Sequence, residues 1–246
     1  MSARQLLDTS HAMPLARPAY PRPPYRFVDR EFIIITYRTD RAALARVVPA
    51  PLKVSEPVVK YEFIRMPDSS GLGSYTESGQ VIPVTFNGEA GGYTLGMYLD
   101  NVPALLSGRE LLGFPKTLAQ PRVAVASDTI VCTLEANGVR VATATMAYKH
   151  ESLDLDEVQR SLGAPGYLLK AIPHIDGSPR VRELVRYRAG GIVVKEAWSG
   201  PASLELHPHW LLPVAQLPVL EVLSAVHIIA DLSLGEAEVV HDYLGK

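Results

Sequence analysis

Apolar and polar residues alternate along many short stretches of this chain, and Gly, Pro and Asn-Gly pairs separate the stretches. Residues 58–66 show the pattern clearly, because Tyr61 and Phe63 alternate with Lys60 and Glu62. Successive side chains of a strand point to opposite faces, so this period of two predicts β-strands. Further segments rich in apolar and β-branched residues are 30–37, 81–86, 93–99, 130–135, 139–146, 167–172, 181–188, 192–198, 203–207 and 219–234.

Helical signals are few and short. Asp40 and Asn101 are favourable N-caps, and a third helix would begin at Asp154 with acidic residues in its first turn. The expected helices cover residues 41–48, residues after Asn101 to about 111, and residues 154–162. Asn137-Gly138 is the strongest hairpin signal in the chain. Many short strands with few short helices indicate a β-rich α+β domain rather than a doubly wound sheet.

The chain divides into a proline-rich lead-in, residues 1–24, and a single domain, residues 25–246. Prolines recur from Pro14 to Pro24, and each removes a backbone donor, so the lead-in is expected to be irregular and to stay out of any sheet interior. No internal repeat or linker divides the rest of the chain, and 246 residues are enough for one sizeable core.

Composition excludes several classes of function. The formal net charge is −2 and charged residues make up 20% of the chain, with no basic run that would suit nucleic acid. No stretch approaches the length of a membrane span, and the N-terminus lacks a basic region before an apolar core, so a cytoplasmic protein without membrane contact is expected. The single cysteine, Cys132, lies in a strand-like run and is expected to be a buried structural thiol.

Metal and serine chemistry are poorly supported. No G-x-S-x-G motif is present, and the only close histidine pair, His207 and His209, lacks further ligand partners. His227 lies among apolar residues, which favours a hydrogen-bonded core histidine over a catalytic base. We therefore expect no metal ion.

Lys116 has the most unusual surroundings of any charged residue. It follows Phe114-Pro115 within the stretch RELLGFPKTL, with leucines on both sides. An amine held among apolar groups loses hydration, and this desolvation favours the neutral, nucleophilic form. The alternative is a lysine whose apolar stem is buried while its ammonium reaches water.

Several motifs around Lys116 together resemble the acetoacetate decarboxylase family, from about residue 14 to the C-terminus. The combination of SYTESGQ, GREL and an aromatic-Pro-Lys run is specific. The motifs are RPPYRFVDREF at 22–32, ITYRTDRAALARVVPAPL at 35–52, DSSGLGSYTESGQVIPVTFNG at 68–88, MYLDNVPALLSGREL at 97–111, VRVATATMAYKH at 139–150, HIDGSPRVREL at 174–184, EAWSGPASLEL at 196–206 and HIIADLSLGEAEVVHDYL at 227–244. The resemblance implies one domain built on an antiparallel β-barrel or β-sheet core.

The resemblance also implies the chemistry and its residues. Lysine amines act covalently by condensing with carbonyl groups, and acetoacetate decarboxylases are the standard example. Lys116 takes the position of the Schiff-base lysine, Glu77 that of the acid/base carboxylate and Arg30 that of the prominent basic residue, with Glu62 beside them. The implied reaction converts acetoacetate, or a close 3-oxo acid, to a methyl ketone (acetone) and CO₂ without a cofactor.

The residues alone leave other interpretations open for the same positions. Glu77 could be a loop carboxylate that caps backbone N–H groups. Arg30 could form an ion pair with its neighbours Asp29 or Glu31. Glu62 shares the face of its strand with apolar residues, which indicates a carboxylate directed inward.

Three apolar residues are candidates for the walls around the departing carboxylate: Phe27, Met97 and Phe114. The best-known members of the family carry a second lysine after the nucleophile, whereas this chain has Thr117. Adjacent side chains of an extended segment point to opposite faces, so residue 117 is expected to lie outside the pocket. Desolvation, with Arg30 as a secondary cation, would then activate the amine.

Two other functions remain compatible with the resemblance. A relative could use the Schiff-base lysine for aldol or dehydration chemistry on another oxo acid, or the fold could bind a small molecule without turnover. The resemblance further implies a large homo-oligomer and a small-molecule 3-oxo acid partner.

Overall fold

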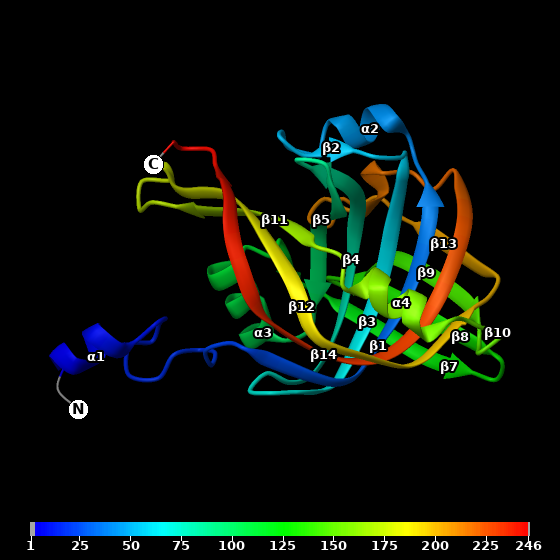
Figure 1. Cartoon of the computed structure of the whole chain (residues 1–246), viewed down its shortest axis with the longest axis horizontal. Helices are drawn as coiled ribbons and strands as arrows, with labels where there is room; N and C mark the ends of the chain where they lie inside the picture. Colours follow the sequence, from blue (N-terminus) through cyan, green and yellow to red (C-terminus); the bar gives the residue numbers. More distant parts are fainter. Residues whose placement is uncertain (1–2, 246) are drawn as a thin grey trace.

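The computed structural model describes residues 3–245, which form two β-sheets and a few short helices (Figure 1). The larger sheet contains β1 (Tyr25–Arg38), β2 (Lys53–Val54), β3 (Val58–Ser69), β4 (Gly73–Phe86), β5 (Glu89–Leu99), β6 (Lys116–Leu118), β10 (Glu151–Ser152), β11 (Gly166–Pro173), β12 (Pro179–Ser199) and β14 (Glu221–Asp242). The smaller sheet contains β7 (Gln120–Ala126), β8 (Thr129–Ala136), β9 (Val139–Ala147) and β13 (Ala202–Leu206). The helices are α1 (Ala3–Thr9), α2 (Arg41–Ala45), α3 (Val102–Ser107), the π-helix η1 (Gly108–Leu112), α4 (Leu155–Leu162) and the 3₁₀-helix η2 (Val214–Gln216).

The larger sheet closes into a barrel. Its strands follow the order β4-β3-β1-β14-β12-β11-β5, and a further pairing of β5 with β4 completes the circuit. All pairs in this circuit are antiparallel except the short parallel contact of β5 with β11. The β-rich α+β class and the antiparallel β-barrel are therefore confirmed.

Alternation along the strands separates two apolar regions. On β1 and β3, Ile33, Ile35, Tyr61 and Phe63 face the smaller sheet and form the main core with it. The intervening residues face the barrel interior, where Phe32 and others form a second cluster. Since the side-chain period of a strand is two, one stretch of sequence serves both regions.

The local signals in the sequence are largely confirmed. Asp40, Asn101 and Asp154 each cap their helix by accepting a hydrogen bond from a backbone N–H three residues on. Asn87-Gly88 and Asn137-Gly138 form tight turns with positive φ at all four residues, as expected for hairpins. These signals are short-range, so no tertiary contact was needed to interpret them.

Several element boundaries differ from the expectation. Residues 3–9 are helical rather than irregular, because the prolines of the lead-in all follow this segment. The predicted strands 181–188 and 192–198 are one strand, β12, in which a register shift after Gly190 absorbs the glycine pair. The helix after Asn101 ends at Ser107 and continues as the π-helix η1, with Gly113 in the left-handed conformation that stops it.

Candidate active site

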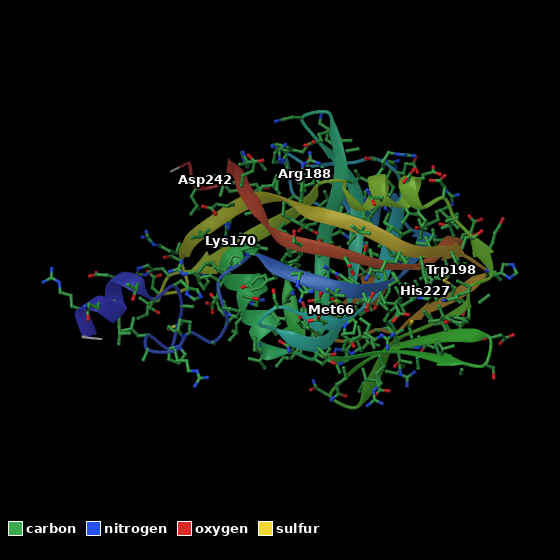
Figure 2. The ribbon with its side chains drawn as sticks, turned by 60° about the horizontal axis from the view of Figure 1, so that its bottom comes forward. Met66, Lys170, Arg188, Trp198, His227 and Asp242 are labelled. Carbon is green, nitrogen blue, oxygen red and sulfur yellow. The ribbon has the colours of Figure 1, made fainter. Side chains whose placement is uncertain are left out.

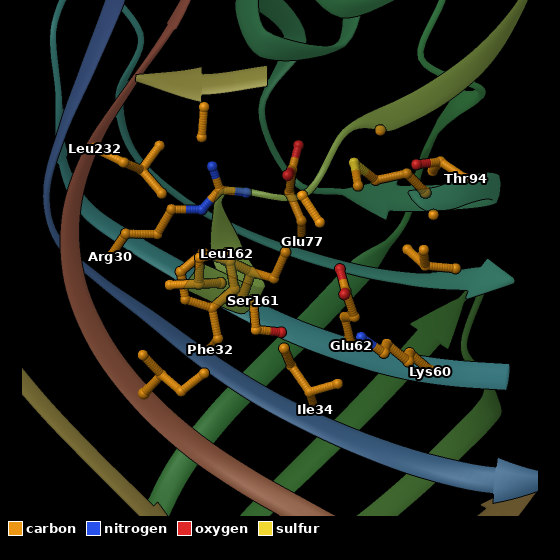
Figure 3. A pocket seen from close by; sticks show the side chains of 18 of the residues that line it. Arg30, Phe32, Ile34, Lys60, Glu62, Glu77, Thr94, Ser161, Leu162 and Leu232 are labelled. Carbon is orange, nitrogen blue, oxygen red and sulfur yellow. The ribbon is translucent and has the colours of Figure 1, made fainter. Parts of the chain in front are cut away.

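The barrel encloses a cavity of about 530 Å³, with strands on its sides and α4 contributing to its wall. All seven residues singled out from the sequence line this one cavity: Phe27, Arg30, Glu62, Glu77, Met97, Phe114 and Lys116. They come from five strands and from the segment after η1. Figure 3 shows the side chains of Arg30, Glu62 and Glu77 reaching into the same space from β1, β3 and β4.

Lys116 and Glu77 form a buried ion pair in the cavity. The Lys116 Nζ lies 2.6 Å from Oε1 of Glu77, and the two side chains are 8% and 3% exposed. Nζ also donates a hydrogen bond to the carbonyl oxygen of Ala104 at 3.2 Å, and it lies 5.3 Å from the centroid of the Phe114 ring. A proton on either group has its partner within transfer distance.

The backbone around η1 fixes where the Lys116 side chain can lie. The N–H groups of Gly113 and Phe114 both donate to the Gly108 carbonyl at 2.9 Å, which turns the chain back toward β5. A Cβ on Gly108 would lie 2.7 Å from Cδ of Lys116, so only glycine leaves room for the lysine stem. Arg109 adds a hydrogen bond from Nη1 to the Lys116 carbonyl at 2.9 Å.

Glu77 is not a loop carboxylate that caps backbone groups. It lies within β4, opposite Ile64 of β3 and Leu99 of β5, and is 2% exposed. The sequence had placed the start of this strand later, at residue 81. The longer strand explains the position of Glu77, because β4 delivers its side chain directly into the barrel.

Arg30 reaches the cavity because of a bulge in β1. Phe27 and Arg30 are three residues apart and would face opposite sides of a regular strand, but the register shifts between them and Asp29 has φ 52°. Both side chains therefore line the cavity. The guanidinium lies 5.0 Å from the Phe27 ring centroid and 4.8 Å from that of Phe32.

The alternative for Arg30, an ion pair with a sequence neighbour, is wrong. Asp29 pairs with Lys195 at 2.6 Å, and Glu31 pairs with Arg65 at 2.7 Å. None of the ion pairs formed by the described residues includes Arg30, and its buried Nε has no hydrogen-bond partner among them. The cavity therefore contains a guanidinium free to bind an anion.

Glu62 lies on the cavity face of β3, as its alternation indicated. Burial raises the pKa of the Glu62 carboxyl above its usual value, with a further contribution from the charge of Glu77, while the charges of Lys60 and Arg30 act against this. A carboxyl group with a raised pKa keeps its proton to higher pH.

The cavity also contains residues that the sequence did not single out. Burial raises the pKa of the Tyr187 hydroxyl to about 12, and it holds that of Tyr75 well above its usual value. Lys60, Thr94 and Ser161 add further polar groups (Figure 3). Their strands and helix are far apart in the chain, so only the barrel closure brings them together. Thr117 does not line the cavity, which agrees with the expected direction of its side chain.

The remaining candidates are structural. His209 uses Nδ1 to accept hydrogen bonds from the N–H groups of Leu211 and Leu212, and residues 3–245 contain no cluster of metal-ligating side chains. Cys132 is buried in the main core, where burial raises the pKa of its thiol. His227 is 1% exposed and hydrogen-bonded to Glu31. None of the helices in the described part of the chain could serve as a membrane span.

Comparisons with known proteins identify the family and agree with the fold. The family model "Acetoacetate decarboxylase (ADC)" matches residues 12–244. The acetoacetate decarboxylases of Paraburkholderia xenovorans and Burkholderia vietnamiensis are 60% and 61% identical over all 246 residues, which cover 98% and 100% of those proteins. The crystal structure of the acetoacetate decarboxylase of Legionella pneumophila superposes with a TM-score of 0.94 at 47% identity, covering 100% of both chains. The chain belongs to the acetoacetate decarboxylase family.

Proposed function

We propose that this protein decarboxylates acetoacetate to acetone and CO₂ through an imine on Lys116. The pairing of the Lys116 amine with the Glu77 carboxylate at 2.6 Å, beside the unpaired guanidinium of Arg30, is the observation that carries the proposal. Full-length relatives at about 60% identity are acetoacetate decarboxylases. A 3-oxo acid supplies the groups that these residues would bind, a ketone for the amine and a carboxylate for the guanidinium.

The first step is condensation of the neutral amine with the substrate ketone. Glu77 accepts the proton of the ammonium and then returns a proton to the departing hydroxyl, so that water leaves and a protonated imine forms. The cation of the imine takes the place of the ammonium beside Glu77. The buried ion pair is therefore kept through the covalent step.

Loss of CO₂ follows from the charge of the imine. The bond between C2 and the carboxylate breaks, and its electron pair moves toward the imine nitrogen to give an enamine. Arg30 orients the substrate carboxylate before this step. The apolar walls formed by Phe27, Phe32 and Phe114 destabilise the negative charge of that carboxylate, which is absent from the CO₂ that forms. Protonation at C2 and hydrolysis of the imine release acetone and regenerate Lys116.

Release of CO₂ from acetoacetate by the purified protein tests the proposal. Turnover well above the spontaneous rate is expected. An imine that forms on Lys116 without release of CO₂ would instead indicate aldol or dehydration chemistry. Binding without covalent chemistry would indicate a non-catalytic protein of the same fold.

We also propose that the protein acts as a homo-oligomer in the cytoplasm, with a small 3-oxo acid as its partner. Family membership supports the substrate class. Light scattering on the purified protein would measure the number of subunits.

A further inference from the structure

The cavity is longer than acetoacetate requires. Cavities of about 300–1,000 Å³ usually enclose drug-sized ligands, and this one, at about 530 Å³, falls in that range although acetoacetate is a four-carbon acid. Glu77 lies opposite Ile64 in the register of β3 and β4, and Lys60 is four residues from Ile64 along β3. At a rise of about 3.3 Å per residue, the cavity wall therefore continues roughly 13 Å beyond the level of Glu77.

Lys60 supplies a second cation in this extension. It lines the cavity on the same face of β3 as Glu62 (Figure 3), and Thr36, Val81 and Pro83 line the wall around it. None of the ion pairs formed by the described residues includes Lys60. Its charge acts on Glu62 without a direct contact of ion-pair length. An ammonium turned toward a partly apolar cavity, with no carboxylate bound to it, is a site for an anion.

The charges inside the cavity suit a dianion. Lys116 and Glu77 neutralise each other as a pair, which leaves Arg30, Lys60 and Glu62. Burial raises the pKa of Glu62, which favours its neutral form. Arg30 and Lys60 line the cavity as two separate cations without an ion-pair partner among the described residues, one near the reacting lysine and one in the extension.

We propose that the cavity also accepts 3-oxo dicarboxylic acids, with the carboxylate that is lost near Arg30 and the remote carboxylate bound by Lys60. This inference rests on the imine chemistry proposed for Lys116. The bond from C2 to the first carboxylate breaks, its electron pair moves to the imine nitrogen, CO₂ leaves, and C2 gains a proton. Hydrolysis then releases a keto acid one carbon shorter, in which the remote carboxylate is unchanged.

A matched pair of substrates separates the charge from the length of the chain. The probes are 3-oxohexanedioate and 3-oxohexanoate, which have the same number of carbons but differ in the remote carboxylate, together with acetoacetate. The proteins are the wild type, Lys60→Met, Lys60→Arg and a control, Lys53→Met, whose lysine is exposed on β2 outside the cavity. The quantity measured is the ratio of kcat/KM for the diacid to kcat/KM for the monoacid, corrected for spontaneous decarboxylation.

The wild type is expected to decarboxylate the diacid, and Lys60→Met to lower the ratio by about tenfold or more, the loss typical of one charge-assisted contact. Lys60→Arg should keep most of the ratio, and Lys53→Met should leave it unchanged. The inference is overturned if acetoacetate and 3-oxohexanoate are substrates but the diacid is not, or if Lys60→Met leaves the ratio unchanged. Failure of the wild type on acetoacetate itself would overturn the proposed function and this inference with it.

Discussion

Two enclosed glutamates on neighbouring strands respond to burial in opposite ways. Glu31 of β1 faces the smaller sheet, where His227 Nε2 lies 2.8 Å from Oε1 and Arg65 Nε donates to Oε2 at 2.7 Å. Burial alone would raise the pKa of Glu31, but these partners outweigh it and hold the pKa below its usual value. Glu62 of β3 faces the cavity, and there burial prevails and raises its pKa.

The difference shows that the two faces of the larger sheet have different roles, one in the core and one in the cavity. On the core side, Glu31 is bound by both His227 and Arg65. Figure 2 shows His227 beside Trp198 near one end of the molecule, and their ring centroids are 5.5 Å apart. On the cavity side, Arg30 and Lys60 have no ion-pair partner among the described residues. Burying unpaired charges lowers the stability of the fold. Unpaired charges on the cavity face therefore indicate that these residues serve binding or catalysis.

Removal of the amine should produce the largest effect on the cavity side. Lys116→Arg should lower turnover of acetoacetate by about 10⁴-fold or more, since a guanidinium does not deprotonate and cannot form the imine. The thermal unfolding midpoint should change little by comparison. Because arginine is larger beside Gly108, Lys116→Met serves as a second variant. Substantial turnover by both folded variants would contradict the assignment.

Loss of the carboxylate beside the amine should have the next largest effect. Glu77→Gln keeps the shape of the side chain but cannot transfer protons. We expect kcat to fall by about 10²-fold or more, with a smaller change in KM. Steady-state kinetics would show this, and kcat close to that of the wild type would mean that Glu77 is not the proton carrier.

A matched change on the core side should affect stability rather than turnover. Glu31→Gln should lower the free energy of unfolding by about 1–3 kcal/mol at neutral pH, because His227 and Arg65 lose a charged acceptor. The folded pKa of Glu31 is lowered, so its contribution is present above the unfolded pKa and is lost as pH falls. Urea unfolding at several pH values should therefore show the two proteins converging in acid. A difference that grows as pH falls would refute this account.

The same substitution at Glu62 should have a smaller effect of opposite pH dependence. The folded pKa of Glu62 is raised, so the wild type loses stability as pH rises from the unfolded toward the folded value. Glutamine does not ionise, so Glu62→Gln does not lose this stability. Its free energy of unfolding should therefore rise relative to that of the wild type between the unfolded and the folded pKa of Glu62. Urea unfolding of Glu31→Gln and Glu62→Gln at the same pH values compares the two sites directly. If the difference in unfolding free energy from the wild type followed the same pH trend in both variants, the two glutamates would not respond to burial in opposite ways.

The smallest effect is expected outside the cavity. Thr117→Lys should change kcat/KM by less than about twofold and leave the acidic limb of its pH profile in place, because Thr117 does not line the cavity. A cation about 4 Å from Lys116 would be worth about 4 kcal/mol at an effective dielectric constant of 20. A shift of the limb by a pH unit or more would show that residue 117 does act on the amine.

The sequence predicted those parts of the fold that depend on local signals. Alternation identified the strands, and Asp40, Asn101 and the two Asn-Gly pairs marked helix starts and turns correctly. Gly190-Gly191 was misleading because a bulge inside a long strand has the same sequence signal as a loop between two strands. Closure of the barrel by β4 and β5 depends on pairings that no local signal specifies.

The site, like the barrel closure, depends on long-range contacts that local sequence signals do not specify. The resemblance supplied Lys116, Glu77 and Arg30, but neither it nor the alternation revealed that a bulge at Asp29 turns Arg30 inward. The direct contact of Lys116 with Glu77 joins segments 39 residues apart, and the role of Lys60 depends on which strands surround it. Such contacts follow from the closed barrel and not from neighbouring residues.

Trapping of the covalent intermediate tests the central proposal most directly. The protein is incubated with acetoacetate and borohydride, which reduces an imine to a stable amine, and the peptides are then analysed by mass spectrometry. We expect the added mass on the peptide containing Lys116 and loss of activity in proportion to labelling. Labelling at Lys60, Lys149, Lys170 or Lys195 in place of Lys116, or inactivation without any labelled lysine, would contradict the account.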